Sequence, residues 1–423
     1  MKLQKILARF QKLHPKEIDL SLGRIQKLCK KLGNPQDNLN CISVVGTNGK
    51  YSTIQALRAI LNEANINFNI YTSPHIQKIN ERFIYNNHEI NDSDLADLLA
   101  EVENINKNDP ITFFEIITAA FFYGAKKYSN NITIIESGLF HRFDATNILK
   151  KNLSTVITSI GLDHLDWLPE NEQTIDKIIY EKTSTLLNSN IIISKQSSKD
   201  ILNKIKNSIK DNKSKKIIFG NEFNYLINEN NFFFFEDEFG GIKLPYPNTK
   251  GKFQLDNITA AIATIRNLKL NIDDEKIKYG ITKIKSIARL QEIKKGKLKN
   301  LIKKNRLFID GSHNPLGAKA LVDYLDTLNC QKHIILGMMA NKDHNKYARC
   351  FNKKISSLTV IDIPNQKNAI KRNALKKKIK LDGIEIQSKS SIQEAINSIP
   401  KKNNEIILIT GSLYLAGEVL NLN

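Results

Sequence analysis

Short apolar runs alternate with segments of helical periodicity along the first half of the chain. Residues 42–45 form a β-branched run, a glycine-rich turn follows, and the apolar residues of 54–64 recur at helical spacing. By the same criteria we predict strands at 68–71, 132–135, 155–160 and 191–194, and helices at 92–104 and 113–127. Continuous apolar strands are typical of parallel sheets that are buried on both faces. The pattern therefore predicts an α/β fold with a mostly parallel sheet between layers of helices.

The alternation stops at residues 217–250, where a phenylalanine run and glycine and proline turn residues predict antiparallel strands. A helix is predicted at 256–268, and the lysine-rich stretch 283–305 is interpreted as the join between domains. The α/β alternation then restarts, with strands predicted at 307–309, 333–336, 358–363 and 405–409 and a helix at 317–328. We predict two domains, residues 1–286 and residues 287–423, each long enough for its own core.

Composition narrows the class of protein. The chain has 423 residues, of which 41% are hydrophobic and 25% charged, as is usual for globular proteins. No apolar run approaches the ~20 residues that a membrane-spanning helix needs. The first residues lack the apolar core of a secretory signal. The four cysteines show no CxxC spacing, which indicates neither a disulfide framework nor a zinc site and predicts a cytoplasmic protein.

The net charge of +20 has two interpretations. It can reflect an anionic partner such as nucleic acid, a nucleotide or an acidic metabolite. It can also reflect heavy use of lysine on an ordinary surface. The basic residues are spread along the chain without interleaved aromatic residues, so the sequence favours the second interpretation and no nucleic-acid partner is expected.

Residues 46–52 read GTNGKYS and lie between a predicted strand and a predicted helix. In that context the backbone N–H groups and the helix N-terminus form a cradle for an anion, and Lys50 can reach the phosphates of a nucleotide. The strict phosphate-loop pattern places Ser or Thr directly after the lysine, whereas here Tyr51 intervenes before Ser52. The alternative is a glycine-rich turn with a surface lysine.

The motifs along the whole chain, taken in order, resemble those of the folylpolyglutamate synthase/dihydrofolate synthase family of the Mur ligase superfamily. They are GTNGKYS at 46–52, YTSPH at 71–75, NER at 80–82, TFFE at 112–115, ESGLFHRFDATN at 136–147, SIGLDH at 159–164, EK at 181–182, DGSHNP at 310–315, GMMANKD at 337–343 and TGSLYL at 410–415. The resemblance implies a phosphate-loop domain with a mostly parallel sheet and a smaller, Rossmann-like α/β C-terminal domain.

Three polar residues follow predicted strands: Ser73, Glu136 and His164. Because open α/β sheets bind ligands at the ends of their strands, these side chains beside a phosphate loop form a candidate Mg²⁺ site. His164 taken alone is more typical of a hydrogen-bonded structural histidine. The resemblance implies Ser73 and Glu136 on one Mg²⁺ and His164 on a second. It also implies that Lys182, otherwise a helix-surface residue, is carbamylated and becomes a metal ligand, although EKTS replaces the usual EKAG.

The resemblance also implies residues that bind substrates. Those implied for ATP are Thr47, Asn48, Gly49, Lys50, Ser52, Asn257, Arg289 and Asp310. Those implied for the pterin are Glu17, Ile18, Asp19, Leu20, Thr112, Phe113, Phe114, Glu115, Phe143, Asp144 and Ala145, and those for glutamate are His313 and Ser412. Ordinary alternatives remain open: an interdomain salt bridge for Arg289, a loop cap for Asp310, core packing for Phe113 and Phe114, and turn stabilisation for His313 and Ser412.

The activity implied is an ADP-forming ligase. It phosphorylates the carboxylate of dihydropteroate or of a tetrahydrofolate polyglutamate, and the amine of L-glutamate then captures the acyl phosphate. The segment IDLSLGRI at 18–25 resembles the bifunctional bacterial enzymes. Lys50, Glu136, His164 and Lys182 would be catalytic, a hinge is expected near 284–289, and we expect a monomer without a membrane partner.

Alternatives remain at this stage. They are a folylpolyglutamate synthase without the second activity, a basic nucleic-acid-binding ATPase, and a non-catalytic relative. A cell-wall Mur ligase is disfavoured by TFFE and DATN. The non-catalytic relative is motivated by two departures, Tyr51 and the pair Phe140-His141, which stand where the family has glycines. A phenylalanine at a position of positive φ would be strained.

Overall fold

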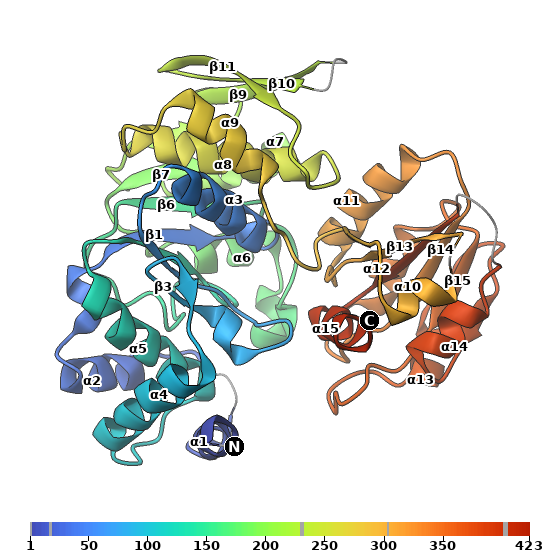
Figure 1. Ribbon diagram of the computed structural model, residues 1–423, viewed down its shortest axis with the longest axis horizontal. Helices are drawn as coiled ribbons and strands as arrows, with labels where there is room; N and C mark the ends of the chain where they lie inside the picture. Colours follow the sequence, from blue (N-terminus) through green and yellow to red (C-terminus); the bar gives the residue numbers. More distant parts are fainter. Residues whose placement is uncertain (1, 17–18, 229–231, 303, 401–404) are drawn as a thin grey trace. The chain divides into compact units, whose positions relative to one another are not determined.

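The computed structural model of the protein describes residues 2–16, 19–228, 232–302, 304–400 and 405–423 and divides into two compact units (Figure 1). The N-terminal unit comprises Met1–Ile160, Thr174–Asn248 and Asp256–Ile284, and the C-terminal unit comprises Gly161–Gln173, Thr249–Leu255 and Lys285–Asn423. The chain thus passes into the C-terminal unit three times, whereas the sequence prediction drew one boundary between 286 and 287. No helix in the described ranges is long and apolar enough to cross a membrane.

An eight-stranded sheet of order β4-β3-β2-β5-β1-β6-β7-β8 forms the centre of the N-terminal unit. Neighbours from β2 to β8 pair in parallel, and only β3 and β4 pair antiparallel at one edge. The strands are β1 (Asn40–Val45), β2 (Phe68–Tyr71), β3 (Phe83–Tyr85), β4 (His88–Glu89), β5 (Ile132–Glu136), β6 (Ser154–Ile157), β7 (Asn190–Ile193) and β8 (Lys216–Ile218). The predicted parallel sheet is confirmed, and its central strands are apolar throughout because they are buried.

Helices flank this sheet. They are α1 (Lys2–Phe10), α2 (Gly23–Lys31), α3 (Lys50–Glu63), α4 (Asp92–Asn106), α5 (Phe113–Ala125), α6 (Ile175–Thr183), α7 (Lys199–Ser208), α8 (Phe253–Asn267) and α9 (Asp274–Thr282). Helix α5 is buried along almost its whole length, which explains its nearly uniform apolar sequence. Within the unit, α1, α2, α4 and α5 gather at one end, and the small sheet of β9–β11 lies at the other (Figure 1).

That small sheet is antiparallel, as predicted for 217–250. It consists of β9 (Phe223–Asn228), β10 (Phe232–Asp237) and β11 (Gly240–Pro245) in the order β11-β10-β9. The prediction was wrong at its start, because residues 217 and 218 belong to β8 and pair in parallel with β7. Ile217 and Ile218 are buried, so they continue the apolar interior of the main sheet instead of starting the hairpin.

The C-terminal unit contains a six-stranded sheet of order β12-β13-β17-β14-β15-β16, which is parallel except for the pair β12–β13. Its strands are β12 (Gln291–Ile293), β13 (Arg306–Ile309), β14 (Lys332–Leu336), β15 (Ser357–Val360), β16 (Ile386–Ser388) and β17 (Ile406–Thr410). Its helices are α10 (Lys297–Leu301), α11 (Pro315–Asp326), α12 (His344–Arg349), α13 (Arg372–Lys378), α14 (Ile392–Asn397) and α15 (Leu413–Leu422). The predicted second α/β domain is confirmed as a fold.

The lysine-rich stretch 283–305 was interpreted as a join, and that interpretation was wrong for most of its length. It contributes β12 to the edge of the sheet and then α10. Ile293 and Leu298 are buried between surface lysines. Elements as short as β12 and α10 contain too few apolar residues to show a strand or helix period. The many lysines therefore made the stretch resemble a linker.

Candidate active site

The loop between β1 and α3 approaches two neighbouring segments very closely. Gly46 has φ 148° and Gly49 has φ 94°. A Cβ at Gly46 would lie 2.0 Å from Thr158 Oγ1, and one at Gly49 would lie 2.3 Å from Asn257 Oδ1. Both glycines are therefore required by conformation and by space. The same packing places Asn257, from α8, directly beside the loop.

Backbone contacts hold this loop against the end of β6. Thr47 N and Asn48 N both donate to Ser159 O, at 3.0 and 3.1 Å. Gly49 is the N-cap of α3 and makes no side-chain cap hydrogen bond, so the first turn of the helix is not closed by a capping side chain. Lys50 Nζ folds back over the loop and donates to Gly46 O at 3.2 Å. This is a phosphate cradle in form, with a positive helix end and a lysine beside it. Ser52 is buried in the first turn of α3.

Glu136 and Ser73 meet at the same edge of the sheet. Glu136 is the last residue of β5 and lies level with Val44 of β1, two residues before the phosphate loop. Ser73 follows β2, the other neighbour of β5, and its N–H donates to Glu136 Oε2 at 3.1 Å. Glu136 is 4% exposed. The buried Glu136 carboxylate and Ser73 are therefore in contact with each other beside the phosphate cradle.

These two residues fit Mg²⁺. It prefers oxygen ligands and keeps few from the protein when phosphate and water supply the rest. In the part of the chain that the structure describes, no cluster of three or more His, Cys, Asp or Glu could hold a metal ion by itself. A cation here would therefore depend on the oxygens of a nucleotide.

Lys182 lies on α6 and joins the phosphate loop to the loop after β5. Its Nζ donates to Gly46 O at 2.9 Å and to Leu139 O at 2.7 Å, and it lies 5.6 Å from the centre of the Phe140 ring. An unmodified lysine offers donors and no acceptor, so this side chain fits two carbonyls and does not fit a metal ion. Its predicted place among the metal ligands requires carbamylation and stays a prediction.

Phe140 and His141 are accommodated without the strain that the sequence suggested. Neither is among the residues with positive φ. Both are buried, and the N–H of His141 donates to Glu181 O at 3.0 Å. Burial, with a contribution from the nearby Lys182 ammonium, lowers the pKa of His141 to about 4. His141 is therefore neutral near pH 7, and the glycine pair of the family is not needed for this backbone.

Several residues predicted to bind the pterin meet around Arg24 of α2. Arg24 Nε donates to Glu115 Oε2 at 2.9 Å, and Nη1 donates to Asp19 Oδ2 at 2.8 Å. Thr112 caps α5, and its hydroxyl donates to the same Glu115 oxygen at 2.8 Å. The other oxygen, Glu115 Oε1, is buried and accepts no hydrogen bond from any residue that the structure describes. Leu20, which follows Asp19 in the sequence, is half-buried. Glu17 and Ile18 lie outside the described residues.

Asp144 organises the second group of predicted pterin residues. Its Oδ2 accepts from Gly138 N at 2.9 Å, and its Oδ1 accepts from the hydroxyl of Thr146 at 2.6 Å. Burial raises the pKa of Asp144, against the lowering effect of these hydrogen bonds. Phe114 lies against the same turn, Phe113 is half-buried, Ala145 is buried, and Phe143 is exposed beneath the Arg142 guanidinium, 4.2 Å from its ring centre.

Gly138→Ala should damage this group selectively. The added Cβ would lie 2.7 Å from Asp144 Oδ2 and 3.2 Å from Phe114 Cζ, so the carboxylate and the ring must shift. We expect the KM of the pterin substrate to rise by about 10-fold or more, because displacement of a positioning group by an ångström costs that much. Initial rates at varied pterin and varied ATP measure it. An equal rise in both KM values would contradict the assignment, and the control is Gly241→Ala, where the added Cβ meets only ordinary contact with Phe234 Cε1 at 3.4 Å.

In the C-terminal unit, Asp310 caps the strained turn that carries Arg289. Its Oδ2 accepts from Leu290 N and its Oδ1 from Ser312 N, both at 2.7 Å. Ala288 and Leu290 have φ 53° and 50°, a left-handed conformation that is costly without glycine. Burial raises the pKa of Asp310, against the nearby Arg289. The loop-cap interpretation of Asp310 thus describes its contacts well, and the ATP roles of Asp310 and Arg289 stay predictions.

The remaining predicted residues also belong to the C-terminal unit. His313 Nδ1 lies 3.1 Å from Gly311 O and Nε2 lies 3.2 Å from Asp163 Oδ2. Ser412 caps α15 by accepting from Tyr414 N at 3.1 Å. His164 has φ 56°, and its Nε2 lies 3.8 Å from Asp163 Oδ2. The predicted residues that the structure describes are thus divided between the two units.

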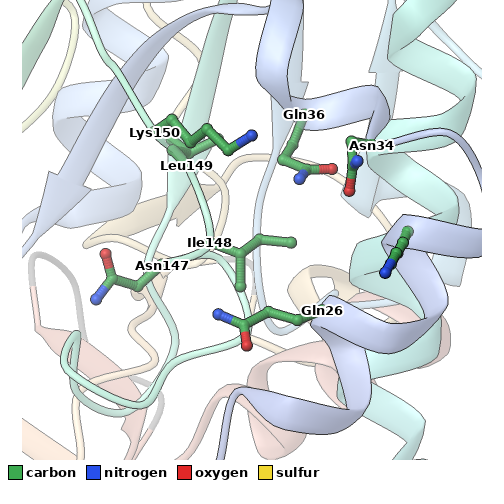
Figure 2. Close-up of a pocket in the computed structure, with 8 residues that line it drawn as sticks. Gln26, Asn34, Gln36, Asn147, Ile148, Leu149 and Lys150 are labelled. Atoms are coloured by element: carbon green, nitrogen blue, oxygen red, sulfur yellow. The ribbon is translucent and has the colours of Figure 1, made fainter.

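A pocket lies elsewhere in the N-terminal unit. Figure 2 shows this pocket of about 430 Å³, lined by Gln26, Lys30, Asn34, Gln36, Asn147, Ile148, Leu149 and Lys150. None of these is a predicted site residue. Arg24, which contacts Asp19 and Glu115, and Asp163, which contacts His313, were missed as site residues. Only their places inside recognisable motifs could have signalled them.

The sequence of this chain is similar to a known family model and to characterised proteins. Residues 292–413 match the family model "Mur ligase, glutamate ligase domain". The dihydrofolate synthase/folylpolyglutamate synthase of Bacillus subtilis is 29% identical over 94% of each chain. The folylpolyglutamate synthase of Lacticaseibacillus casei is 28% identical over 94% of this chain and 92% of its own.

Solved structures share the fold of this chain over nearly its whole length. Escherichia coli FolC in complex with DHPP and ADP has a TM-score of 0.86 and 25% identity, and it covers 99% of this chain and 97% of its own. A Yersinia pestis enzyme complexed with AMPPNP and Mn has the same TM-score of 0.86 at 22% identity, which supports the fold.

The phosphate cradle, the parallel sheet and the matched C-terminal domain define an ATP-dependent glutamate ligase of the Mur ligase type. Within that class, the chain is similar over nearly its whole length to enzymes of the folylpolyglutamate synthase/dihydrofolate synthase family. The family predicted from the motifs is confirmed, as is the ligase class; the individual site roles stay predictions.

Proposed function

We propose that this protein adds L-glutamate to the carboxylate of dihydropteroate and of folylpolyglutamates, with conversion of ATP to ADP and phosphate. One observation carries the proposal: the glycine-rich cradle with Lys50 opens at the same sheet edge as the Ser73–Glu136 pair. A nucleotide triphosphate in this cradle would present its terminal phosphate to the region where an acid substrate must react.

The reaction begins with a carboxylate, which is a poor acyl donor. Attack of a carboxylate oxygen on the γ-phosphorus forms an acyl phosphate and releases ADP. The amine of glutamate then attacks the carbonyl carbon, and the amide forms as phosphate leaves. The chain supplies position and charge for these steps. Lys50 and the α3 N-terminus would neutralise the phosphates, and Arg289 is proposed as a further cationic contact of ATP.

Ser73 and Glu136 would hold Mg²⁺, which when bound supplies positive charge to the phosphate oxygens. His164 is the candidate ligand of a second Mg²⁺, and Lys182 in carbamylated form is a further candidate metal ligand. Glu136 keeps its buried carboxylate oriented through the Ser73 N–H, and Asn257 flanks the cradle at Gly49.

The pterin proposal rests on the donor and acceptor pattern around Arg24. The free oxygen of the buried Glu115 carboxylate suits the N–H groups on the amidine edge of a pterin, since a buried acceptor needs a donor. The exposed ring of Phe143 offers a face on which a flat heterocycle can stack. For glutamate, His313 and Ser412 in the C-terminal unit are the proposed contacts.

ADP release tests the proposal directly. We expect release that depends on L-glutamate and on either dihydropteroate or tetrahydrofolate, with Mg²⁺ present. ADP release that ignores glutamate, or that responds only to nucleic acid, would contradict it.

The same assay separates the second candidate, folylpolyglutamate synthase activity alone. That candidate is favoured by the comparable similarity to the Lacticaseibacillus casei protein. It predicts turnover with tetrahydrofolate and none with dihydropteroate.

A further inference from the structure

The segment Gly161–Gln173 leaves the end of β6 in the N-terminal unit but packs as part of the C-terminal unit. It contains no α-helix or β-strand and only two short 3₁₀ turns, Leu165–Trp167 and Glu170–Glu172. Its place in the C-terminal unit is therefore set by side-chain contacts and not by a shared ladder of backbone hydrogen bonds. We call this segment the latch.

Asp163 makes three polar side-chain contacts with the rest of the C-terminal unit. Its Oδ1 accepts from Lys342 Nζ at 2.6 Å. Its Oδ2 accepts from Asn314 Nδ2 at 2.8 Å and lies 3.2 Å from His313 Nε2. The side chains of Asp163 and Lys342 are only 5% and 10% exposed. Removing two charges from water is costly, so such a pair persists only where its geometry is well satisfied.

Two further contacts fix the latch against the same loops. Asn341 Nδ2 donates to Asp166 Oδ2 at 3.0 Å. A Cβ at Gly161 would lie 2.9 Å from Leu316 Cδ2, so this backbone lies directly on the start of α11. Apart from Leu316, these partners come from the loops after β13 and β14, and the loop after β13 also carries the proposed glutamate contact His313.

Asp163 also shapes the backbone of the next residue. His164 N donates to Asp163 Oδ1 at 2.8 Å, and His164 adopts the left-handed conformation with φ 56°. One carboxylate thus sets the turn at His164, orients the His313 ring and ties both to Lys342. An exposed ion pair contributes little to stability and restrains its neighbours weakly. The several contacts of the buried Asp163 carboxylate restrain this turn more strongly.

We propose that Asp163 is a positioning residue that, with Lys342, makes the latch part of the C-terminal unit and aligns His313 for glutamate. His164 is therefore carried by the C-terminal unit and not by the strand that precedes it. The glutamate arm of this inference rests on the proposed function, whereas the mechanical arm does not.

Hydrogen exchange of the full chain tests the mechanical arm without any activity. Asp163→Asn and Lys342→Met should each raise amide exchange within 161–173 by about 10-fold or more, because local opening loses its main restraint. Exchange in β6 and in the phosphate loop should stay unchanged. The control is Asp362→Asn, which breaks a C-terminal ion pair (Arg372 Nη1 to Asp362 Oδ2, 2.6 Å) that does not touch the latch.

Steady-state kinetics test the glutamate arm. Each variant should raise the KM of glutamate by about 10-fold with the KM of ATP within about 2-fold, and the double variant should do no worse than either single one, because the two act as a unit. Unchanged exchange in the latch, exchange that rises equally across the whole C-terminal unit, or parallel rises in both KM values would overturn the proposal. A wild-type enzyme that ignores glutamate would defeat the proposed function, while the exchange result would still decide the latch.

Discussion

Lys50→Ala should lower glutamate-dependent ADP release by about 1,000-fold, because it removes a preorganised charge from the transferring phosphate. Lys50 Nζ lies over the loop within hydrogen-bond distance of Gly46 O and Thr47 O, at 3.2 and 3.4 Å. It therefore sits at the mouth of the cradle and does not form part of the core. The measurement is the initial rate of ADP formation at saturating substrates.

Lys12→Ala is the matched control, since it removes one exposed lysine far along the chain from the cradle. Both variants should unfold at temperatures close to that of the wild type. A Lys50→Ala enzyme that turns over at nearly the wild-type rate would show that the cradle does not serve the reaction.

Glu136→Gln should lower turnover by about 100-fold or more and raise the Mg²⁺ concentration needed for half-maximal rate, because a neutral amide oxygen would hold Mg²⁺ more weakly than the carboxylate does and less positive charge would then stabilise the transferring phosphate. The amide oxygen can still accept from Ser73 N–H, so the strand end keeps its local structure. A Mg²⁺ titration of the initial rate measures both effects.

Glu238→Gln serves as the control here, because Glu238 forms an exposed ion pair with Lys215 in the N-terminal unit. It should leave the Mg²⁺ dependence unchanged. A Glu136→Gln enzyme with reduced turnover but the wild-type Mg²⁺ requirement would assign Glu136 a structural role and remove it from the metal site.

The fold could be predicted where one physical rule dominated a segment. The central strands are apolar throughout because both faces of the sheet are covered, and β2 was predicted at its observed bounds. The prediction failed where surface charge or the shortness of an element hid the hydrophobic pattern. β12 and α10 bury single apolar residues between lysines, and the short edge strands β3 and β4 carry too few residues for a period.

The candidate site shows a different limit. The phosphate loop is local, so its glycines and Lys50 were readable from seven consecutive residues. The contacts of Arg24 with Glu115 and of Asp163 with Lys342 join positions 91 and 179 residues apart. A pattern of neighbouring residues cannot show contacts between positions so far apart in the sequence. Backbone conformation was equally hidden, because the sequence of Phe140 and His141 does not give the sign of φ.

Transfer of an oxygen label tests the central claim most directly. Substrate labelled with ¹⁸O in its carboxylate should pass one labelled oxygen to the phosphate released with ADP, because the acyl phosphate keeps that oxygen when the amine of glutamate displaces it. Phosphate that carries no label while the amide product forms would contradict the account, since the carboxylate would then never have been phosphorylated.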